Sequence, residues 1–375
     1  MKYLELKSFT TLTLSLTAVL LFMLTACDDN SGQKISIVKS ERTQEKHPEI
    51  AIQKAENDNS IKTAETKDVF REITESQNNS SILDDTVLPL SELNKASSSP
   101  TYGITSNQQD ISKNILSIIE SNKGHKKRPL RIVYFNPKDR KPVADYQQRI
   151  QEIMLKLQNY YGKGMEQNGF GYRTFDLETN QGNLKIHFIQ SQEPAQNYSR
   201  DSKTSQQIYS MTADKLKENG IDIENETVIV FQNLAKIDAD SFYDTSAPYY
   251  GTWNTNKHRK GFCYVVDSEY LNWKNLSQKK NKIKFNGTKT MTAGELASGQ
   301  IGGVCHELGH AFCLNHTHSD SVQNLKFGTA LMGYGNWTFK QELRQEGKGT
   351  YLSFVSATKL IGHPCFSPLK SGNHN

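Results

Sequence analysis

The sequence predicts one mixed α/β domain that follows a long polar leader. Three observations support this fold class: the uneven spread of aromatic residues, alternating strand and helix patterns after residue 129, and a polar composition before it. Of 35 Phe, Trp and Tyr residues, three lie in 1–27, two in 28–128 and 30 in 129–375. A segment of roughly a hundred residues with two aromatics cannot offset its ordering entropy. We therefore expect one globular domain over 129–375 and exclude a polytopic membrane protein.

Residues 1–27 are predicted to be an export signal. Lys2 and Lys7 supply positive charge, and the stretch that follows is uncharged up to Cys27, with an apolar centre over 14–24. Its length raises the alternative of a transmembrane anchor. The Ser and Thr content and the small-residue ending favour a cleaved signal instead. The ending Leu24-Thr25-Ala26-Cys27 resembles a bacterial lipobox.

The lipobox resemblance implies that Cys27 is lipidated, becomes the first mature residue and anchors the protein to a membrane. Two or three acyl chains give a stable anchor, whereas a single chain is marginal. An ordinary signal peptide with a chance Cys is the alternative. Asp28 resembles a signal that keeps some lipoproteins on the inner membrane. We expect a lipoprotein of the bacterial cell envelope, with the choice of inner or outer membrane left open.

Residues 28–128 are predicted to be a flexible polar tether. They are rich in Ser, Asn, Gln, Lys, Glu and Thr, a composition typical of a spacer. A short apolar pattern over 111–119 predicts a helix that leads into the domain. The net charge is a mild +5, and a basic cluster at 125–128 fits a solvated linker end. No nucleic-acid-binding motif accompanies that cluster, so we expect no nucleic-acid partner. We also expect a monomer.

Strand and helix patterns alternate from Leu130 onward. Continuous apolar runs predict buried strands, strict alternation predicts a half-buried strand, and spacings of three and four predict an amphipathic helix. A polar helix is stopped at Asn219-Gly220. We expect strands at 130–135, 184–188, 227–231 and 262–266, and helices at 143–160 and 205–218. This order favours an α/β or α+β sheet with helices packed on it.

The segment 303–316 carries a candidate metal site. His306 and His310 lie four residues apart, so on a helix they are about 40° apart and converge on one ion. Glu307 projects beside them, where it can reach a metal-bound water. The opposite face of this helix is apolar, as a helix buried on one side requires. The apolar residues are Ile301, Val304, Leu308, Ala311 and Phe312.

A third His lies six residues after the second. On a continuous helix His316 would point about 120° away from His310, so the chain must leave the helix and turn back. Here the sequence resembles the metzincin metallopeptidases, which share the pattern H-E-x-x-H-x-x-G-x-x-H and a downstream Met-turn. The looser resemblance runs from about residue 129 to 366, over segments such as 134–140, 165–171 and 328–333. Those segments resemble a group of secreted bacterial predicted metallopeptidases.

The resemblance implies a metzincin-like catalytic domain with a twisted mixed sheet, a zinc-site helix and a Met-turn. His306, His310 and His316 match the Zn2+ ligands, and Glu307 matches the general base. Met332 matches the apolar floor beneath the metal. In some metzincins a Tyr two residues after this Met binds the metal or the oxyanion, and Tyr334 stands there; a packed surface Tyr is the alternative reading. The implied activity is a zinc endopeptidase whose partner is a protein or peptide substrate.

One residue departs from the family pattern, because Cys313 stands where metzincins usually have Gly. Gly permits the turn out of the helix, since a positive φ is uncommon for other residues. Cys313 could itself be a ligand on the same helix face, although one straight helix rarely supplies three ligands to a tetrahedral ion. His318 competes with His316 as the third ligand. The sequence leaves these assignments open.

Two other functions remain possible at this point. In a gluzincin-like peptidase a distal Glu would be the third ligand, with Glu342 and Glu346 as candidates. In a catalytically silent zinc-binding lipoprotein the site would serve adhesion. Glu307 weighs against the silent site, because structural zinc sites normally close the fourth position with another ligand.

Four Cys remain after Cys27, which allows two disulfides in three connectivities. Cys305 and Cys313 lie about 12 Å apart along one helix, too far to bridge directly. We expect Cys263 and Cys365 to be their partners if disulfides form.

Overall fold

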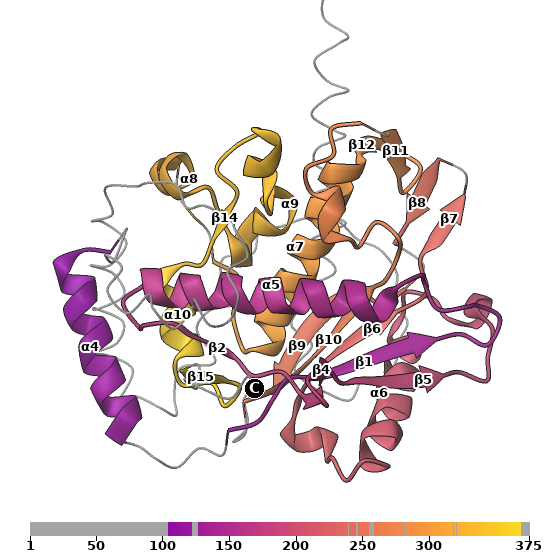
Figure 1. Cartoon of the computed structure of the whole chain (residues 1–375), viewed down its shortest axis with the longest axis horizontal. Coiled ribbons are helices and arrows are strands. Elements are labelled where there is room, and N and C mark those ends of the chain that lie inside the picture. Colours follow the sequence, from indigo (N-terminus) through magenta and orange to yellow (C-terminus); the bar gives the residue numbers. More distant parts are fainter. Residues whose placement is uncertain are drawn as a thin grey trace, which may run out of the picture. The chain divides into compact units, whose positions relative to one another are not determined.

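The computed structural model describes residues 104–368 except 122–126, 239, 245–246, 255–258, 281, 318 and 320. The predicted export signal with Cys27, most of the predicted tether and His318 therefore lie outside the described residues. The described part is a mixed sheet with helices on both faces (Figure 1). Within it, no helix is both long enough and apolar enough to cross a bilayer.

Five strands form the main sheet in the order β5-β1-β6-β10-β9. The first four strands are mutually parallel, and β9 pairs antiparallel with β10 at one edge. Residues of β6 are all buried, as expected for a parallel strand that is covered on both faces. The strands are β5 (Ile186–Gln190), β1 (Arg131–Asn136), β6 (Thr227–Gln232), β10 (Lys260–Val266) and β9 (Tyr250–Asn254).

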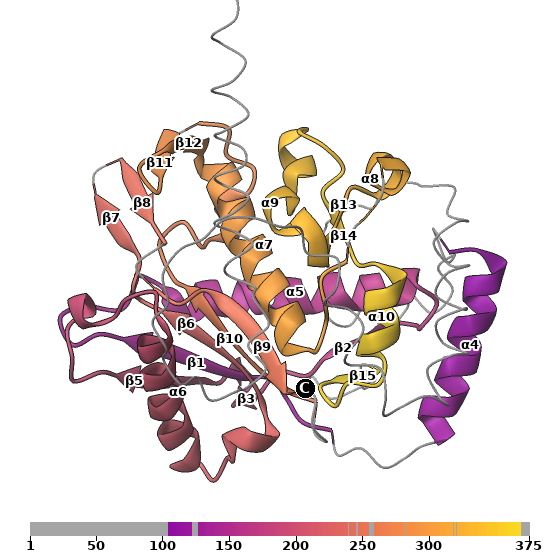
Figure 2. The same ribbon diagram turned by 180° about the vertical axis from the view of Figure 1, so that it is seen from behind.

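Helices cover the two faces of this sheet, as the sequence predicted (Figures 1 and 2). On one face, α6 (Ser202–Lys217) buries Ile208 and Leu216 against a core that includes Val133 and Phe262. On the other face lie α5 (Tyr146–Gln167) and α7 (Ala293–Ala311). The predicted mixed α/β class is therefore confirmed, and α7 is the helix that carries His306 and His310.

Shorter elements complete the domain. A second sheet has the order β12-β11-β8-β7, and three two-stranded sheets pair β13 with β14, β15 with β2, and β3 with β4. The strands of the second sheet are β12 (Lys289–Thr292), β11 (Lys282–Phe285), β8 (Ser241–Tyr243) and β7 (Lys236–Asp238). The paired strands are β13 (Thr329–Ala330), β14 (Thr350–Tyr351), β15 (Phe366–Pro368), β2 (Arg173–Phe175), β3 (Thr179–Asn180) and β4 (Asn183–Leu184). Three short helices are α8 (Ser321–Phe327), α9 (Asn336–Thr338) and α10 (Phe354–Leu360).

Helix α4 (Ser106–Ser121) is the helix expected around 111–119. It lies inside the range that the sequence assigned to the tether, yet it packs on the domain. The buried hydroxyl of Ser112 donates to Asn168 O at 2.9 Å, and Arg173 pairs with Glu120 at 2.5 Å. These contacts place residues 106–121 on the surface of the globular part rather than in a solvated spacer.

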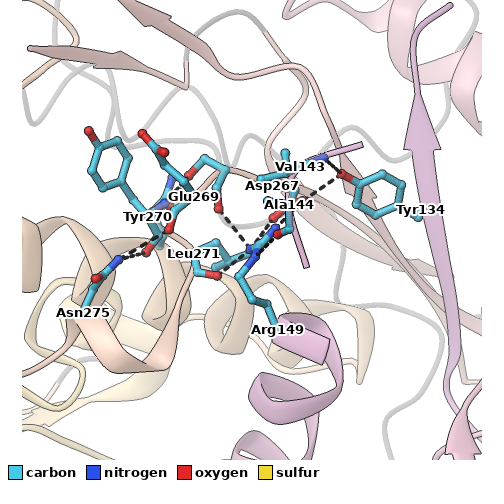
Figure 3. Close-up of polar contacts among 11 residues, drawn as sticks. Tyr134, Val143, Ala144, Arg149, Asp267, Glu269, Tyr270, Leu271 and Asn275 are labelled. Atoms are coloured by element: carbon cyan, nitrogen blue, oxygen red, sulfur yellow. Dashed lines mark hydrogen bonds and ion pairs between the residues drawn. The ribbon is translucent and has the colours of Figure 1, made fainter. Parts of the chain in front are cut away.

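A buried ion pair joins α5 to the segment that follows β10 (Figure 3). The guanidinium of Arg149 donates to both carboxylate oxygens of Asp267, at 2.9 and 3.1 Å. The hydroxyl of Tyr134 donates to the same carboxylate at 2.9 Å. Arg149 also donates to the carbonyl oxygens of Ser268 and Leu271. With Asp267 fully buried, these bonds fix α5 across the carboxyl end of the sheet.

We expect Arg149→Met to destabilise the fold by about 3–5 kcal/mol, because it leaves the buried carboxylate of Asp267 without its cation. Urea denaturation of the two proteins measures the difference. The double variant Arg149→Met/Asp267→Leu is the matched control and should recover most of the loss, since it removes both charges. A single variant within 1 kcal/mol of the unchanged protein would contradict the assigned role of this pair.

Candidate metal centre

Helix α7 lies directly on the two last strands of the main sheet. It begins with a capping box, in which Thr292 and Glu295 satisfy each other's backbone N–H groups. A Cβ atom on Gly251 of β9 would stand 2.2 Å from Glu307 O, and one on Gly261 of β10 would stand 1.9 Å from Ala311 O. Only glycine fits at these two positions, so the helix backbone sits as close to the strands as it can.

Three imidazoles converge at the carboxyl end of α7. The Nδ1–H of His306 donates to Leu331 O at 2.7 Å, and that of His310 donates to Leu314 O at 2.9 Å. A carbonyl oxygen only accepts, so both protons sit on Nδ1 and both Nε2 atoms are left for a metal. His310 Nε2 and His316 Nε2 are 3.1 Å apart, and the ligand atoms of all three His lie within 4.8 Å of one another.

This donor set fits a zinc ion. Two Zn–N bonds of about 2.0–2.1 Å at a tetrahedral angle place their nitrogens about 3.3 Å apart. Burial, together with the nearby His310, lowers the pKa of His306 to about 3, so it stays neutral, the form that binds a metal. Among the described residues, the three His are the group that could hold a metal ion, and three protein ligands leave a fourth position open.

The chain leaves α7 through Cys313, which adopts the left-handed conformation at φ 68°. Its N–H donates to His310 O, and the N–H of Leu314 donates to Gly309 O, the two bonds of a Schellman ending. Cys313 therefore makes the turn that the family pattern gives to Gly. Farther along the chain, Thr317 N–H donates to Met332 O at 2.9 Å. This bond holds the segment that carries His316 close to the other two His.

The Met-turn residue lies against the same helix. Met332 is 1% exposed, and a Cβ on Gly309 would stand 2.4 Å from its Sδ. It belongs to the π-helical turn Leu331–Gly335, whose first carbonyl holds His306. Tyr334 follows in this turn and is 52% exposed, without a hydrogen bond to a described residue. Its proposed contact with the metal or the oxyanion stays a prediction.

Glu307 is buried beside the three His with one carboxylate oxygen unsatisfied. The backbone N–H of Gly251 donates to the carboxylate, while Oε2 has no hydrogen-bond partner. Burial raises the pKa of Glu307 to about 7, against the lowering effects of this N–H and of the cation of Arg200. A buried oxygen without a partner is costly, and a water on the metal is the group that would satisfy it.

One aromatic side chain of the site was not found from the sequence. Trp253 of β9 stacks on His310 with ring centroids 5.9 Å apart and planes inclined by 13°. The segment that carries it has five residues with a Gly between aromatics, too short and irregular to give a strand signal.

Several sequence candidates lie outside the cluster. Cys313, Glu342 and Glu346 are not in the group of possible ligands, and Glu346 pairs with Arg344 at 2.7 Å. The disulfides considered above do not form, because all four Cys are free. Three of them are fully buried, where burial raises the thiol pKa.

The candidate site could hold one metal ion and lies beside a mixed sheet. Its helix supplies two His and a Glu, and the segment after the turn supplies the third His. No protein-family model and no curated protein matches this chain. Solved structures of OgpA from Akkermansia muciniphila do match it. The wild-type protein is 29% identical with a TM-score of 0.52, over 65% of this chain and 62% of that chain.

A second OgpA structure holds a catalytically inactive form in complex with an O-glycopeptide substrate, glycodrosocin. It is 27% identical with a TM-score of 0.52, over 65% of this chain and 63% of that chain. This chain therefore spans less than two thirds of the length of the OgpA chains that it matches.

Proposed function

We propose that this protein is a zinc-dependent endopeptidase of metzincin type that hydrolyses O-glycosylated peptides. The observation that carries the proposal is the pairing of three convergent imidazole Nε2 atoms with a buried, unsatisfied carboxylate oxygen of Glu307. A closed structural site would have a fourth protein ligand instead. The likeness to OgpA, which binds an O-glycopeptide substrate, supports the substrate class.

The three His would hold Zn2+, which would lower the pKa of a water and polarise the substrate carbonyl. Glu307 Oε2 would take a proton from the attacking water and deliver it to the leaving amine nitrogen. The N–H of Gly251, which donates to the carboxylate, would hold Glu307 in place for both transfers. At the sheet edge, β9 has no outer neighbour among the described strands and can pair with an extended peptide.

We expect the zinc-loaded protein to cleave an O-glycopeptide, to lose the activity with a chelator and to regain it when Zn2+ is added back. Mass spectrometry of the products gives the cleaved bond, and the same peptide without sugar is the matched substrate. If the fully zinc-loaded protein cleaves neither peptide, the silent zinc-binding alternative is correct. Equal cleavage of both peptides would contradict the proposed preference for O-glycopeptides but would still support the proposed zinc peptidase activity.

The second part of the proposal is the membrane anchor at Cys27, which the Leu24–Cys27 motif supports. We expect Cys27→Ser to abolish labelling with a radioactive fatty acid and to leave the signal uncleaved. Cys313→Ser is the matched control, since that thiol lies in the domain, and it should label normally. Unchanged labelling of Cys27→Ser would exclude the anchor.

A further inference from the structure

Trp253 lies on the edge strand β9, and its ring stacks on His310 of the candidate metal site. Alternate residues of a strand face the same side, and on β9 this side carries Gly251 against Glu307 and Trp253 against His310. The residue opposite Trp253 in β10 is Gly261, which also lacks a side chain. Trp253 therefore faces α7, and its neighbours on this face, Gly251 along the strand and Gly261 across it, bring no side chain against the indole.

Stacking on Trp253 is not needed to orient His310. The imidazole is already held through its Nδ1–H on Leu314 O and through the buried helix that carries it. The indole is only half-buried, and its N–H makes no hydrogen bond to a described residue. An amphipathic ring with an open donor beside a metal centre is typical of a ligand contact rather than of core packing.

The position of Trp253 limits which part of a substrate it can touch. His310 would be one of the residues that hold the metal, which would polarise the carbonyl under attack, so that carbonyl would lie close to the His310 ring. Because an extended peptide advances about 3.3 Å per residue, a ring 5.9 Å from the His310 ring lies within about two residues of the scissile bond. A bulky group on a residue next to that bond would meet the indole.

We propose that Trp253 contacts the sugar on the Ser or Thr nearest the scissile bond, an inference that rests on the proposed glycopeptide activity. The apolar face of a neutral pyranose ring packs on an aromatic ring, and the indole N–H donates to a sugar hydroxyl. Trp253 would thereby make the enzyme favour peptides with an O-linked sugar next to the cleaved bond.

Binding to an inactive background tests this contact without hydrolysis. In Glu307→Gln, calorimetry should show that Trp253→Leu weakens binding of an O-glycopeptide by about tenfold and leaves binding of the sugar-free peptide unchanged. Trp253→Phe keeps a ring but lacks the N–H, so its affinity for the O-glycopeptide should lie between that of the Glu307→Gln background and that of Trp253→Leu. Thr252→Ser on the opposite face of β9 is the matched control and should bind both peptides like the background protein.

Two results would overturn the contact. Equal weakening for both peptides would mean that Trp253 binds the peptide backbone or a peptide side chain. Loss of zinc from Trp253→Leu, measured by mass spectrometry, would mean that the indole positions His310. Absence of hydrolysis by the unchanged protein would instead refute the proposed function, so the two failures are distinguishable.

Discussion

Replacing Glu307 with Gln should abolish peptide hydrolysis while zinc stays bound. The side chain lies beside the three His but outside the ligand group, so its removal leaves all three imidazoles in place. Gln keeps the size and can still accept from Gly251 N–H, yet it cannot take a proton from water. General-base catalysis contributes at least about 10²-fold, so the turnover number should fall by that factor or more. The rate of peptide cleavage and the zinc content, measured on one preparation, test the loss of hydrolysis and the retention of zinc.

The same substitution should stabilise the metal-free protein above neutral pH. Burial raises the folded-state pKa of Glu307 to about 7 from an ordinary 4.5. A carboxyl with a raised pKa costs nothing below pH 4.5, and its cost grows as pH rises and is complete above pH 7. At pH 8 that cost is about 3 kcal/mol, which Glu307→Gln removes. Urea denaturation with a chelator at pH 4 and pH 8 should show the gain only at the higher pH.

Glu342→Gln is the matched control for both measurements. Glu342 was the candidate ligand of a gluzincin-like site, and the structure leaves it out of the His cluster. It should retain activity and zinc like the unchanged protein. Full activity of Glu307→Gln would refute the general-base role, and loss of zinc from Glu342→Gln would restore the gluzincin alternative.

The sequence predicted the central layers well because their signals are long. Strands β1, β6 and β10 contain continuous apolar runs, and the apolar spacing over 143–160 predicted the helix that the structure places at Tyr146–Gln167. Such runs leave few alternatives to burial in a sheet or beneath a helix. The pairing of His306 and His310 could be predicted equally directly, because residues four apart lie on the same face of a helix.

The missed features depend on contacts between distant segments. Edge strand β9 and the two-residue strands carry no periodic signal, so Trp253 was not recognised as part of the site. The docking of α4 depends on Ser112 reaching Asn168, 56 residues away. The free thiols follow from where the buried strands and helix place them, which Cys spacing alone does not determine.

The turn after α7 shows how a departure from a motif is accommodated. Cys313 takes the positive φ that Gly would adopt with less strain, and the two Schellman hydrogen bonds are still made. The consequence is that His316 turns back towards His306 and His310 in spite of its exposed position. The position of His316 is thus set by backbone geometry that the sequence had put in doubt.

His316→Ala should strip zinc from the protein without unfolding it. His316 is exposed, and its segment is positioned by backbone bonds at Leu314 and Thr317 that the substitution does not touch. Two imidazoles would remain, and water would have to fill the other two positions. Since loss of an outer partner of a ligand already costs about 10–100-fold in metal affinity, loss of a ligand should cost more than about 100-fold. Competition with a chromophoric chelator measures the affinity, and circular dichroism checks the fold.

His318→Ala separates coordination from nearby charge or packing, because it removes the other His of the same segment. It should keep zinc affinity within about twofold of the unchanged protein, since the three ligands are left complete. If His318→Ala releases zinc and His316→Ala does not, the third ligand is His318. The turn at Cys313 would then have to present the later residue, and the spacing shared with metzincins would be a coincidence.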